Sequence, residues 1–457
     1  MYLKEETQEA RPLRTGGAPQ ERVGLPRIVI VGGGAGGIEL ATKLGNRLGK
    51  RKRAEITLVD FSLTHLWKPL LHEVAAGTLD SHEDDLDYLA QAHAHDFRFR
   101  LGRMVGLDRA KRLIELAPIM DQGGDMIVPG SVLSYDLLVL AVGSVSNDFG
   151  IPGVKEHCAF LDSREQADRF QQRLMRSYLQ ANAQREPLRE GQMTIAIVGG
   201  GATGVELAAE LHNTARQLVA YGFDRIAPER DAKLVLIEAE ERILSTLPER
   251  LSKAAEQRLR ELGVTIHTGE LVTRVTEAGI YTKSGLFVPA ELKVWTAGIK
   301  APDFLRNLDG LETNRLNQIV VRQNLQTTRD PHIYAFGDCA QCPQPGTDRP
   351  VPPRAQAAHQ QAALLAKSLS RVLDGKAPLD YVYRDYGSLI SLSRYTTVGN
   401  LMGNLTGDVM IEGRIARLIY NWLYKSHRIA VRGLMPIMLE TMADWIARPA
   451  KPRLKLH

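Results

Sequence analysis

The residues best suited to chemistry in this chain form two glycine-rich turns, each followed by an acidic residue at the end of an apolar run. The first turn has the spacing G-x-G-x-x-G and joins an apolar run at residues 28–31 to a helical pattern; its glycines are Gly32, Gly34 and Gly37. A strand, a glycine turn and a helix in this order bind the pyrophosphate of a dinucleotide, because the backbone can approach the anion and the helix N-terminus faces it. Asp60 ends the next apolar run, where it can accept hydrogen bonds from a ribose.

The same pattern returns in the middle of the chain, after the apolar run at residues 194–198. The second set of glycines is Gly199, Gly201 and Gly204. Glu238 ends the apolar run that follows, later than the roughly 20 residues expected after such a turn, so the polar residues 215–231 are interpreted as an insertion. A carboxylate at this position repels a 2′-phosphate and favours NADH over NADPH, although Arg242 nearby leaves NADPH open.

Two dinucleotide turns in one chain indicate two nucleotides held face to face, usually for electron transfer between them. Glu206 follows the second turn, and two roles are open to it. In one, it is a favourable charge in the first turn of a helix. In the other, it hydrogen-bonds a nicotinamide amide or orders water near the site of electron transfer. A strand at residues 294–300 ends in small residues, including Gly298, which we expect to close over the nicotinamide end.

The segment after Asp60 carries residue types suited to a flavin. Within residues 65–74, Lys68 can meet negative charge on a reduced flavin or its phosphates, and Pro69 can fix the backbone beside a flat ring. The alternative is a surface loop that packs Trp67 on the body.

Two further apolar strands end in turns that let the backbone approach a cofactor. The run at residues 135–144 ends in small residues, including Gly143. A later strand leads into Gly337 and Asp338, where the glycine permits close approach and the carboxylate can bind a ribityl or phosphate-linked oxygen.

Cys339 and Cys342 form a C-x-x-C pair just beyond this turn. In a disulfide reductase, such a pair at the flavin is the redox couple that faces the substrate. Here the pair lies past the turn with Pro343 behind it, so we expect it not to be catalytic. Four histidines share no metal-like spacing with a cysteine or carboxylate set, so no metal is expected: His72, His82, His93 and His95.

Gln356 and Gln360 follow a pair of prolines that suits the start of a helix. Because they are four residues apart, they share one helix face, and their amides can point together at a carbonyl group. A quinone headgroup is a flat ring with two such carbonyls. The alternative is a polar helix that faces solvent.

With these motifs in place, the chain closely resembles the type II NADH dehydrogenases, single-chain NADH:quinone oxidoreductases of the two-dinucleotide-binding-domain flavoproteins. The resemblance runs from about residue 27 to the C-terminus, and residues 65–70 and the glutamine pair are its most specific parts. It implies FAD at the first glycine turn, Asp60, Lys68 and Asp338, and NADH at the second turn, Glu206 and Glu238. It also implies quinone at Gln356 and Gln360 and a C-terminal membrane anchor.

An α/β fold with two Rossmann-like domains must position these residues. We expect a flexible extension at residues 1–26, an FAD domain at 27–153 and 314–389, an NADH domain inserted at 154–313, and a membrane-anchoring region at 390–457. Strands are predicted at 97–105 and 112–117. The 457 residues suffice for two to four domains, and three cysteines are too few for a disulfide framework, which favours a reducing environment.

Positive charge is concentrated at the C-terminal end of the chain. Residues 412–457 contain nine Lys or Arg and three acids, a net of +6, whereas the whole chain carries +5, so the rest sums to −1. Apolar residues follow helical spacing within 414–429, with basic residues on another face, and 434–446 adds a second apolar stretch with a basic end. No run of eighteen uncharged apolar residues appears, so this part is predicted to lie on an anionic membrane surface as amphipathic helices.

The sequence therefore predicts a respiratory FAD-dependent NADH:quinone oxidoreductase that does not pump protons. Hydride passes from NADH to the flavin, two electrons then reduce ubiquinone or menaquinone, and Glu206, Gln356, Gln360 and Lys68 act at the reacting centre. We expect a peripheral protein on the cytoplasmic face of the cell membrane, with a homodimer possible and no nucleic-acid partner. The alternatives are a soluble disulfide or sulfide oxidoreductase that uses Cys339 and Cys342, and a non-catalytic NADH sensor.

Overall fold

The first glycine turn lies at the centre of a five-stranded parallel sheet with the strand order β23-β11-β1-β2-β5. Its strands are β1 (Arg27–Val31), β2 (Glu55–Asp60), β5 (Arg98–Leu101), β11 (Leu137–Leu140) and β23 (Ile333–Ala335). Residues 28–31 are buried because helices cover both faces of a parallel sheet, which explains the continuous apolar run in the sequence. The last strand, β23, returns from almost 200 residues further along the chain.

The computed structural model describes residues 24–80, 85–121, 123–392, 396–403, 407–412, 425, 428–447 and 454. The predicted extension at residues 1–26 lies outside these residues except for its last three.

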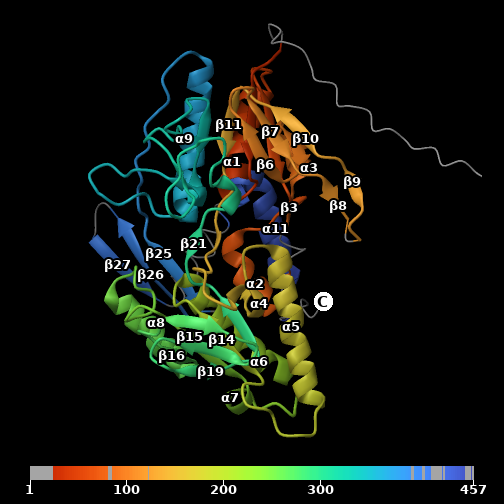
Figure 1. Cartoon of the computed structure of the whole chain (residues 1–457), viewed down its shortest axis with the longest axis vertical. Coiled ribbons are helices and arrows are strands. Elements are labelled where there is room, and N and C mark those ends of the chain that lie inside the picture. Colours follow the sequence, from red (N-terminus) through yellow and green to blue (C-terminus); the bar gives the residue numbers. More distant parts are fainter. Residues whose placement is uncertain are drawn as a thin grey trace, which may run out of the picture.

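The second glycine turn repeats this arrangement in a second parallel sheet, with the order β13-β20-β14-β15-β16. Its strands are β13 (Ala159–Phe160), β14 (Thr194–Val198), β15 (Lys233–Ile237), β16 (Thr265–His267) and β20 (Leu292–Trp295). The first sheet occupies the upper half of the molecule in Figure 1 and the second sheet the lower half. The prediction of an α/β fold with two Rossmann-like sheets is confirmed.

The helices that follow the two turns differ in length. Helix α1 (Ala35–Leu44) has 10 residues, whereas α6 (Ala202–Ala220) has 19, and a short helix α7 (Pro228–Asp231) follows it. The longer helix and α7 account for the late position of Glu238: the segment interpreted as an insertion consists of the end of α6, a connection at 221–227 and α7.

Helices from the first half also pack onto the second half. Helix α2 (Leu71–Ala76) lies between the two sheets and contacts α6 and the long helix α5 (Arg164–Ala183) (Figure 1). Helix α9 (Ala355–Leu373) packs along α1. Leu71, Val74 and Ala75 accordingly belong to the apolar core of the second sheet, which fixes α2 against α6.

Two antiparallel sheets were not foreseen from the sequence. One contains β6 (Met104–Asp108), β7 (Leu113–Leu116) and β10 (Ser131–Ser134), and the other contains β17 (Val272–Val275), β18 (Gly279–Thr282) and β19 (Phe287–Pro289). The single strand predicted at 97–105 was wrong, because the chain leaves the parallel sheet after β5 and enters the antiparallel sheet at β6. The Gly102 amide, which donates to the Asp60 carbonyl at 2.8 Å, marks the change.

Shorter elements complete the described part of the chain. The paired strands are β3 (Thr64–His65) with β4 (Leu86–Asp87), β8 (Ile119–Met120) with β9 (Met126–Val128), β12 (Val145–Ser146) with β21 (Ile299–Lys300), and β22 (Ile319–Val320) with β24 (Ala340–Gln341). The helices are η1 (Gly45–Gly49), η2 (Lys68–Leu70), α3 (Tyr88–His95), α4 (Val154–His157), α8 (Glu249–Glu261), η3 (Asp303–Leu305) and η4 (Gly337–Cys339).

The C-terminal part begins with an antiparallel sheet of β25 (Ser388–Leu392), β26 (Thr396–Gly403) and β27 (Gly407–Glu412). The predicted helix at 434–446 is confirmed as α11 (Leu434–Ala447). The amphipathic helix predicted at 414–429 lies outside the described residues except for residues 425, 428 and 429. Within the residues that are described, no helix is both long enough and apolar enough to span a bilayer.

Candidate active site

The first glycine turn has the backbone geometry that its sequence predicts. Gly32 has φ +102°, and a Cβ there would lie 2.4 Å from the Ala141 carbonyl oxygen; a Cβ on Gly37 would lie 1.8 Å from the Gly32 carbonyl oxygen. Neither position accepts a side chain. A Cβ on Gly34, by contrast, would meet no atom within 4 Å, so the turn leaves open space in front of Gly34.

The second turn has the same three environments. Gly199 has φ +109° and sits against Ala297, and a Cβ on Gly204 would lie 2.0 Å from the Gly199 carbonyl oxygen. Gly201, which corresponds to Gly34, again faces open space. Gly34 and Gly201 begin α1 and α6 without a side-chain cap, and neither helix has an acidic residue in its first turn. The first amides of both helices are therefore free of side-chain caps and suited to a phosphate.

The two acidic residues hold their glycine turns in the same way. Asp60 accepts hydrogen bonds from the amides of Gly33 at 2.6 Å and Ser62 at 2.9 Å. Glu238 accepts from the amides of Gly200 at 2.5 Å and Glu240 at 2.9 Å. A carboxylate has about four acceptor positions, so each retains capacity for ribose hydroxyls. Burial raises the pKa of Asp60, although the amide bonds oppose this.

Arg242, which left the nucleotide preference open, is turned away from such a role. Its guanidinium donates to the carbonyl oxygens of Leu247 at 2.9 Å and Ser245 at 2.7 Å. These bonds commit both terminal nitrogens to the backbone, so Arg242 is poorly placed to neutralise a 2′-phosphate.

Three distant segments meet at Lys68. Its Nζ donates to the Ser144 carbonyl at 2.7 Å and lies 3.5 Å from Asp162, and the Ser144 hydroxyl donates to Asp338 at 2.8 Å. Lys68 and Pro69 form the short helix η2 and not a loop. The structure thus brings Lys68 and Asp338 together through Ser144. Sequence reasoning missed Ser144 and Asp162, because their sequence contexts carry no motif.

The glycines predicted to end strands all have the left-handed backbone that favours this residue. The φ angles are +69° at Gly143, +64° at Gly298 and +71° at Gly337. The Gly337 amide donates to Gln361 at 2.8 Å, which ties this turn to α9. A Cβ on Gly298 would lie 2.4 Å from the Phe149 ring, so Gly298 also provides room for that ring.

Glu206 is the fifth residue of α6, so the prediction that it lies in the first turn was wrong. Its Oε1 accepts a hydrogen bond from the Ser391 amide at 2.9 Å, and its Oε2 lies 3.8 Å from His72 Nδ1. Burial raises the pKa of Glu206 to about 8, with smaller contributions in the same direction from Glu73 and Glu210. Glu206 is therefore protonated and neutral at pH 7. A strongly shifted carboxyl of this kind is typical of functional sites.

His72 was considered in the sequence only as a metal ligand, and its position beside Glu206 was missed. It is 2% exposed, and burial lowers its pKa to about 4, so the imidazole is neutral at pH 7. His72 and Glu206 come close together only when the chain folds, because α2 and α6 are more than 100 residues apart in the sequence. Among the described residues, no group of three or more His, Cys, Asp or Glu side chains could hold a metal ion.

Gln356 and Gln360 share one face of α9 as predicted, but their amides contact the chain itself. Gln356 donates to Asp385 and to the Gly387 carbonyl and accepts from the Tyr386 amide, at 3.1–3.2 Å. Gln360 donates to the Arg384 carbonyl at 2.7 Å and accepts from the Arg384 amide at 3.1 Å. The two glutamines thus anchor residues 384–387 along α9. Both side chains are partly exposed, but their amides bind the chain and do not only face solvent as in the alternative interpretation.

These anchored residues lead directly to Glu206. Residues 384–387 contact Gln356 and Gln360 on α9, and Ser391, four residues further on, donates to Glu206 on α6. We call residues 384–391 the bridging segment. It connects the helix predicted to bind quinone with the helix predicted to bind NADH.

Glu39 occupies the position of Glu206 in the first glycine repeat, and it is also paired with a histidine. It is completely buried on α1, and its Oε2 lies 2.5 Å from Nδ1 of His359 on α9. Lys43 lies 3.4 Å from its other oxygen. The contact joins α1 to α9, which gives His359 a structural position between the first glycine turn and the glutamine pair.

Cys339 and Cys342 do not have the environment of a redox pair. Both are free and buried, and burial raises the pKa of each thiol to about 12. The Cys339 thiol donates to the Phe336 carbonyl at 3.3 Å, inside the core of the first sheet. Thiol–disulfide exchange requires an accessible thiolate, and neither cysteine provides one.

Comparisons with known proteins agree with this geometry. Residues 26–362 match the family model described as pyridine nucleotide-disulphide oxidoreductase. A type II NADH:quinone oxidoreductase of Haemophilus influenzae is 44% identical over 95% of this chain and 100% of its own length. One from Mycobacterium tuberculosis is 28% identical over 92% of this chain and 87% of its own.

Solved structures share the fold. The structure of NDH2 from Plasmodium falciparum in complex with NADH superposes with a TM-score of 0.76 at 18% identity, covering 94% of this chain and all of the other. The sulfide:quinone oxidoreductase of Aquifex aeolicus superposes with a TM-score of 0.70 at 17% identity, over 92% of this chain and 95% of the other.

Proposed function

The chain belongs to the pyridine nucleotide-disulphide oxidoreductase family, as a type II NADH:quinone oxidoreductase, and we propose that it uses FAD to pass two electrons from NADH to a membrane quinone without pumping protons. Three groups of residues support this proposal. They are the two uncapped glycine turns, the cluster of Lys68, Ser144, Asp162 and Asp338, and the bridging segment between Glu206 and the glutamine pair.

FAD fits the first glycine turn. The open space before Gly34 and the uncapped N-terminus of α1 suit its pyrophosphate, and the remaining acceptor positions of Asp60 suit a ribose. Lys68 and Asp338, joined through Ser144, would hold more distal parts of the cofactor. When bound, FAD supplies the two-electron chemistry that connects NADH with a quinone.

NADH fits the second turn by the same argument, with Gly201 at the open position and Glu238 beside it. Because Arg242 is bonded to backbone carbonyls, the carboxylate of Glu238 dominates this end of the site and disfavours a 2′-phosphate. Gly298, with its left-handed backbone, lies in the turn that we assign to the nicotinamide end.

The bridging segment carries the assignment of the quinone site. Among the residues that the structure describes, it is the stretch that contacts both Gln356 and Gln360 on one side and Glu206 on the other. We assign the quinone headgroup to this region and expect the glutamines to act by positioning residues 384–387 as well as by offering amide groups. Glu206, neutral at pH 7, is the proton donor of the site.

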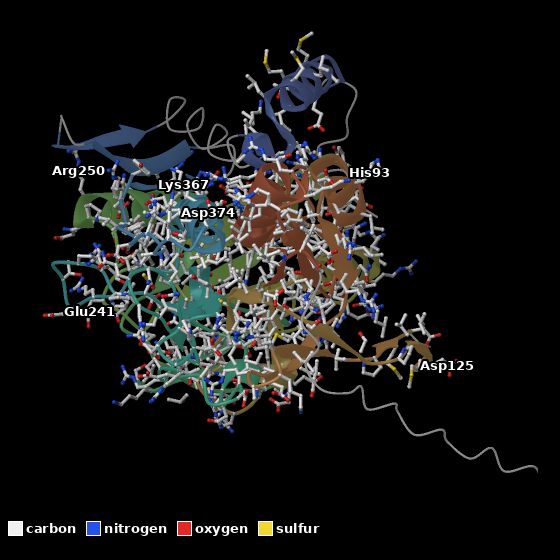
Figure 2. All side chains as sticks on the ribbon, turned by 90° about the horizontal axis from the view of Figure 1, so that it is seen from above. His93, Asp125, Glu241, Arg250, Lys367 and Asp374 are labelled. Atoms are coloured by element: carbon white, nitrogen blue, oxygen red, sulfur yellow. The ribbon has the colours of Figure 1, made fainter. Side chains whose placement is uncertain are left out.

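The C-terminal helix α11 is the surface that we assign to the membrane. Five of its apolar side chains are more than half exposed: Leu434, Met435, Met438, Leu439 and Met442. Figure 2 shows this helix standing out from the body with its sulfur-bearing side chains pointing away from it. The sequence of residues 412–457 has a net charge of +6, which suits an anionic leaflet, and we place the protein peripherally on the cytoplasmic side as a homodimer.

An anaerobic titration of the purified protein tests the whole proposal. NADH should bleach the flavin absorbance, and a short-tail quinone should then restore it. Protein that binds no flavin, or reduced protein that responds to neither benzoquinones nor naphthoquinones, would exclude this function. Quinone-dependent turnover well above the rate with oxygen excludes the NADH sensor.

A further inference from the structure

His72 lies between two carboxyl groups, one buried and one partly exposed. Its Nδ1 is 3.8 Å from Oε2 of Glu206, and its Nε2 is 4.0 Å from Oε1 of Glu73. The side chains of His72, Glu206 and Glu73 are 2%, 10% and 24% exposed, respectively. The most buried of the three, His72, thus lies between the two carboxyls, with an imidazole nitrogen facing each.

The overall reaction requires a proton at Glu206, one end of this row of three groups. NADH, one proton and a quinone give NAD⁺ and a quinol, so NADH supplies both electrons and one hydrogen, and the second proton must come from the protein or solvent. Glu206 can supply it, but a buried carboxyl that has released its proton must recover one from outside. An imidazole can take a proton at one nitrogen and release one at the other, which a carboxylate pair alone cannot do.

We propose that His72 is a positioning residue that returns a proton from the Glu73 side to Glu206 after each turnover. This inference rests on the proposed function. The Glu73 carboxylate first takes a proton from solvent. Its O–H bond then breaks as an N–H bond forms at Nε2 of His72. The N–H at Nδ1 then breaks and the O–H of Glu206 forms. No electrons move in this step. The imidazole ends neutral with its proton on Nε2, and a half-turn of the ring brings this N–H to the Glu206 side before the next turnover.

The surroundings of the ring are consistent with this role. The charged groups that face the pair in the described structure are Glu73 on α2 and Glu210 on α6, and the neighbouring polar groups are the Ser391 amide of β25 and the Pro69 carbonyl. The ring is hydrogen-bonded to the Pro69 carbonyl. The distances from the ring nitrogens of His72 to the two carboxyls are both longer than a hydrogen bond, so a small rotation of the ring must precede transfer. Before transfer, His72 and Glu206 are both uncharged.

Proton exchange at Glu206 measures this role without any quinone. The infrared band of a protonated carboxyl, assigned by its loss in Glu206→Gln, shifts when the flavin-loaded protein is moved into D₂O. In His72→Phe, which keeps an apolar ring of similar size but has no nitrogen, we expect this exchange to slow by about 10²-fold, the lower end of acid–base contributions. Glu73→Gln should slow it as well, because the His72 side chain is only 2% exposed and Glu73 is the carboxyl that faces Nε2.

The same variants are then followed in the two half-reactions. His72→Phe should leave flavin reduction by NADH unchanged and slow reoxidation by quinone, with partial recovery in His72→Gly on addition of imidazole. His93→Phe, the same substitution at an exposed histidine, is the matched control and should change nothing. Unchanged carboxyl exchange in His72→Phe, or equal loss in both half-reactions, overturns the proposal. Failure of the wild type to reduce quinone would instead overturn the proposed function, since exchange is measured separately.

Discussion

At the scale of single residues, the site depends on carboxyl groups whose charge is set by their surroundings. Asp60 and Glu238 end equivalent strands and each bind two backbone amides, whereas Glu206 is buried beside a neutral histidine. The first two are suited to bind hydroxyl groups, and the third to hold a proton. The same residue type therefore serves two purposes in one chain.

Glu238 should determine the choice between NADH and NADPH. In Glu238→Gln the repulsion of a 2′-phosphate is removed while the amide contacts can partly persist, so kcat/KM for NADPH should rise by about 10-fold or more, which corresponds to about 1.4 kcal/mol. Steady-state kinetics with both nucleotides measure the ratio. Arg242→Ala is the control and should leave the ratio nearly unchanged, because that side chain is bonded to backbone carbonyls.

Glu206 should make the stability of the protein depend on pH. Its pKa is raised from the ordinary value of 4.5 to about 8 in the folded protein, so between these values the unfolded chain has lost the proton that the folded protein keeps. The free energy of unfolding therefore falls as pH rises from about 4.5 to about 8 and then levels off, by a few kcal/mol. Glu206→Gln should lack this part of the pH dependence, as measured by denaturant unfolding at pH 5, 6.5 and 8. Parallel curves for the two proteins would contradict the shift.

Replacing Cys339 and Cys342 together by serine should leave quinone reduction within about twofold of wild type, provided that the protein folds. Both thiols are buried away from solvent and protonated, so they cannot form the thiolate that disulfide chemistry needs. Because serine buries a hydroxyl in their place, the paired alanine variant is the control for folding. Loss of turnover in both folded variants would favour the disulfide or sulfide oxidoreductase.

At the scale of elements, the glutamine pair on α9 holds a neighbouring segment in place. Asp385 in this segment also pairs with Arg354, the residue before α9, at 3.0 Å. Three polar side chains at one helix end, those of Arg354, Gln356 and Gln360, thus fix residues 384–387, and β25 begins directly after them. The position of Ser391 against Glu206 thus depends on the N-terminal part of α9.

Gln360→Ala should therefore weaken quinone reduction through the bridging segment. It removes both bonds to Arg384, leaves that backbone without its partners, and should raise KM for quinone more than it lowers the rate of flavin reduction by NADH. Stopped-flow measurement of the two half-reactions separates these effects. Gln360→Glu, which preserves the acceptor, should retain the bond from the Arg384 amide and lose less. An equal decrease in both half-reactions would exclude this role.

At the scale of the whole molecule, the two nucleotide-binding halves meet at α2 and at the bridging segment. Helix α2 comes from the first half and packs on α6 of the second, and this contact creates the pair of His72 and Glu206. The C-terminal region is attached to the first half as well, since Gln91 donates to the Val431 carbonyl at 2.6 Å and Arg432 donates to the Asp85 carbonyl at 3.0 Å. A membrane bound at α11 therefore lies on a surface fixed to the first half.

Replacing Met435, Met438 and Leu439 by serine should release the protein from anionic vesicles without affecting reduction of its flavin by NADH. These side chains are exposed and contribute little to the fold, so their loss removes apolar area available for the bilayer. Sedimentation with vesicles of anionic lipid measures the binding, and high salt should weaken the residual charge-dependent part. Replacing Ile437, which is 3% exposed, is the contrasting variant and should destabilise the fold. Undiminished sedimentation of the triple variant would remove the assignment of α11.

Local sequence determined the two glycine turns, the strands before them and the acids after them, because a strand, a tight turn and a helix N-terminus involve contacts between near neighbours in the chain. It also gave the helix at 434–446 and the shared face of Gln356 and Gln360. Only the tertiary structure decided which residues meet: Lys68 with Ser144 and Asp338, His72 with Glu206, and both glutamines with residues 384–387. The physical reason is that contacts between different elements depend on how helices and sheets pack, and burial by that packing, more than residue type, sets the charge of Glu206 and of the cysteines.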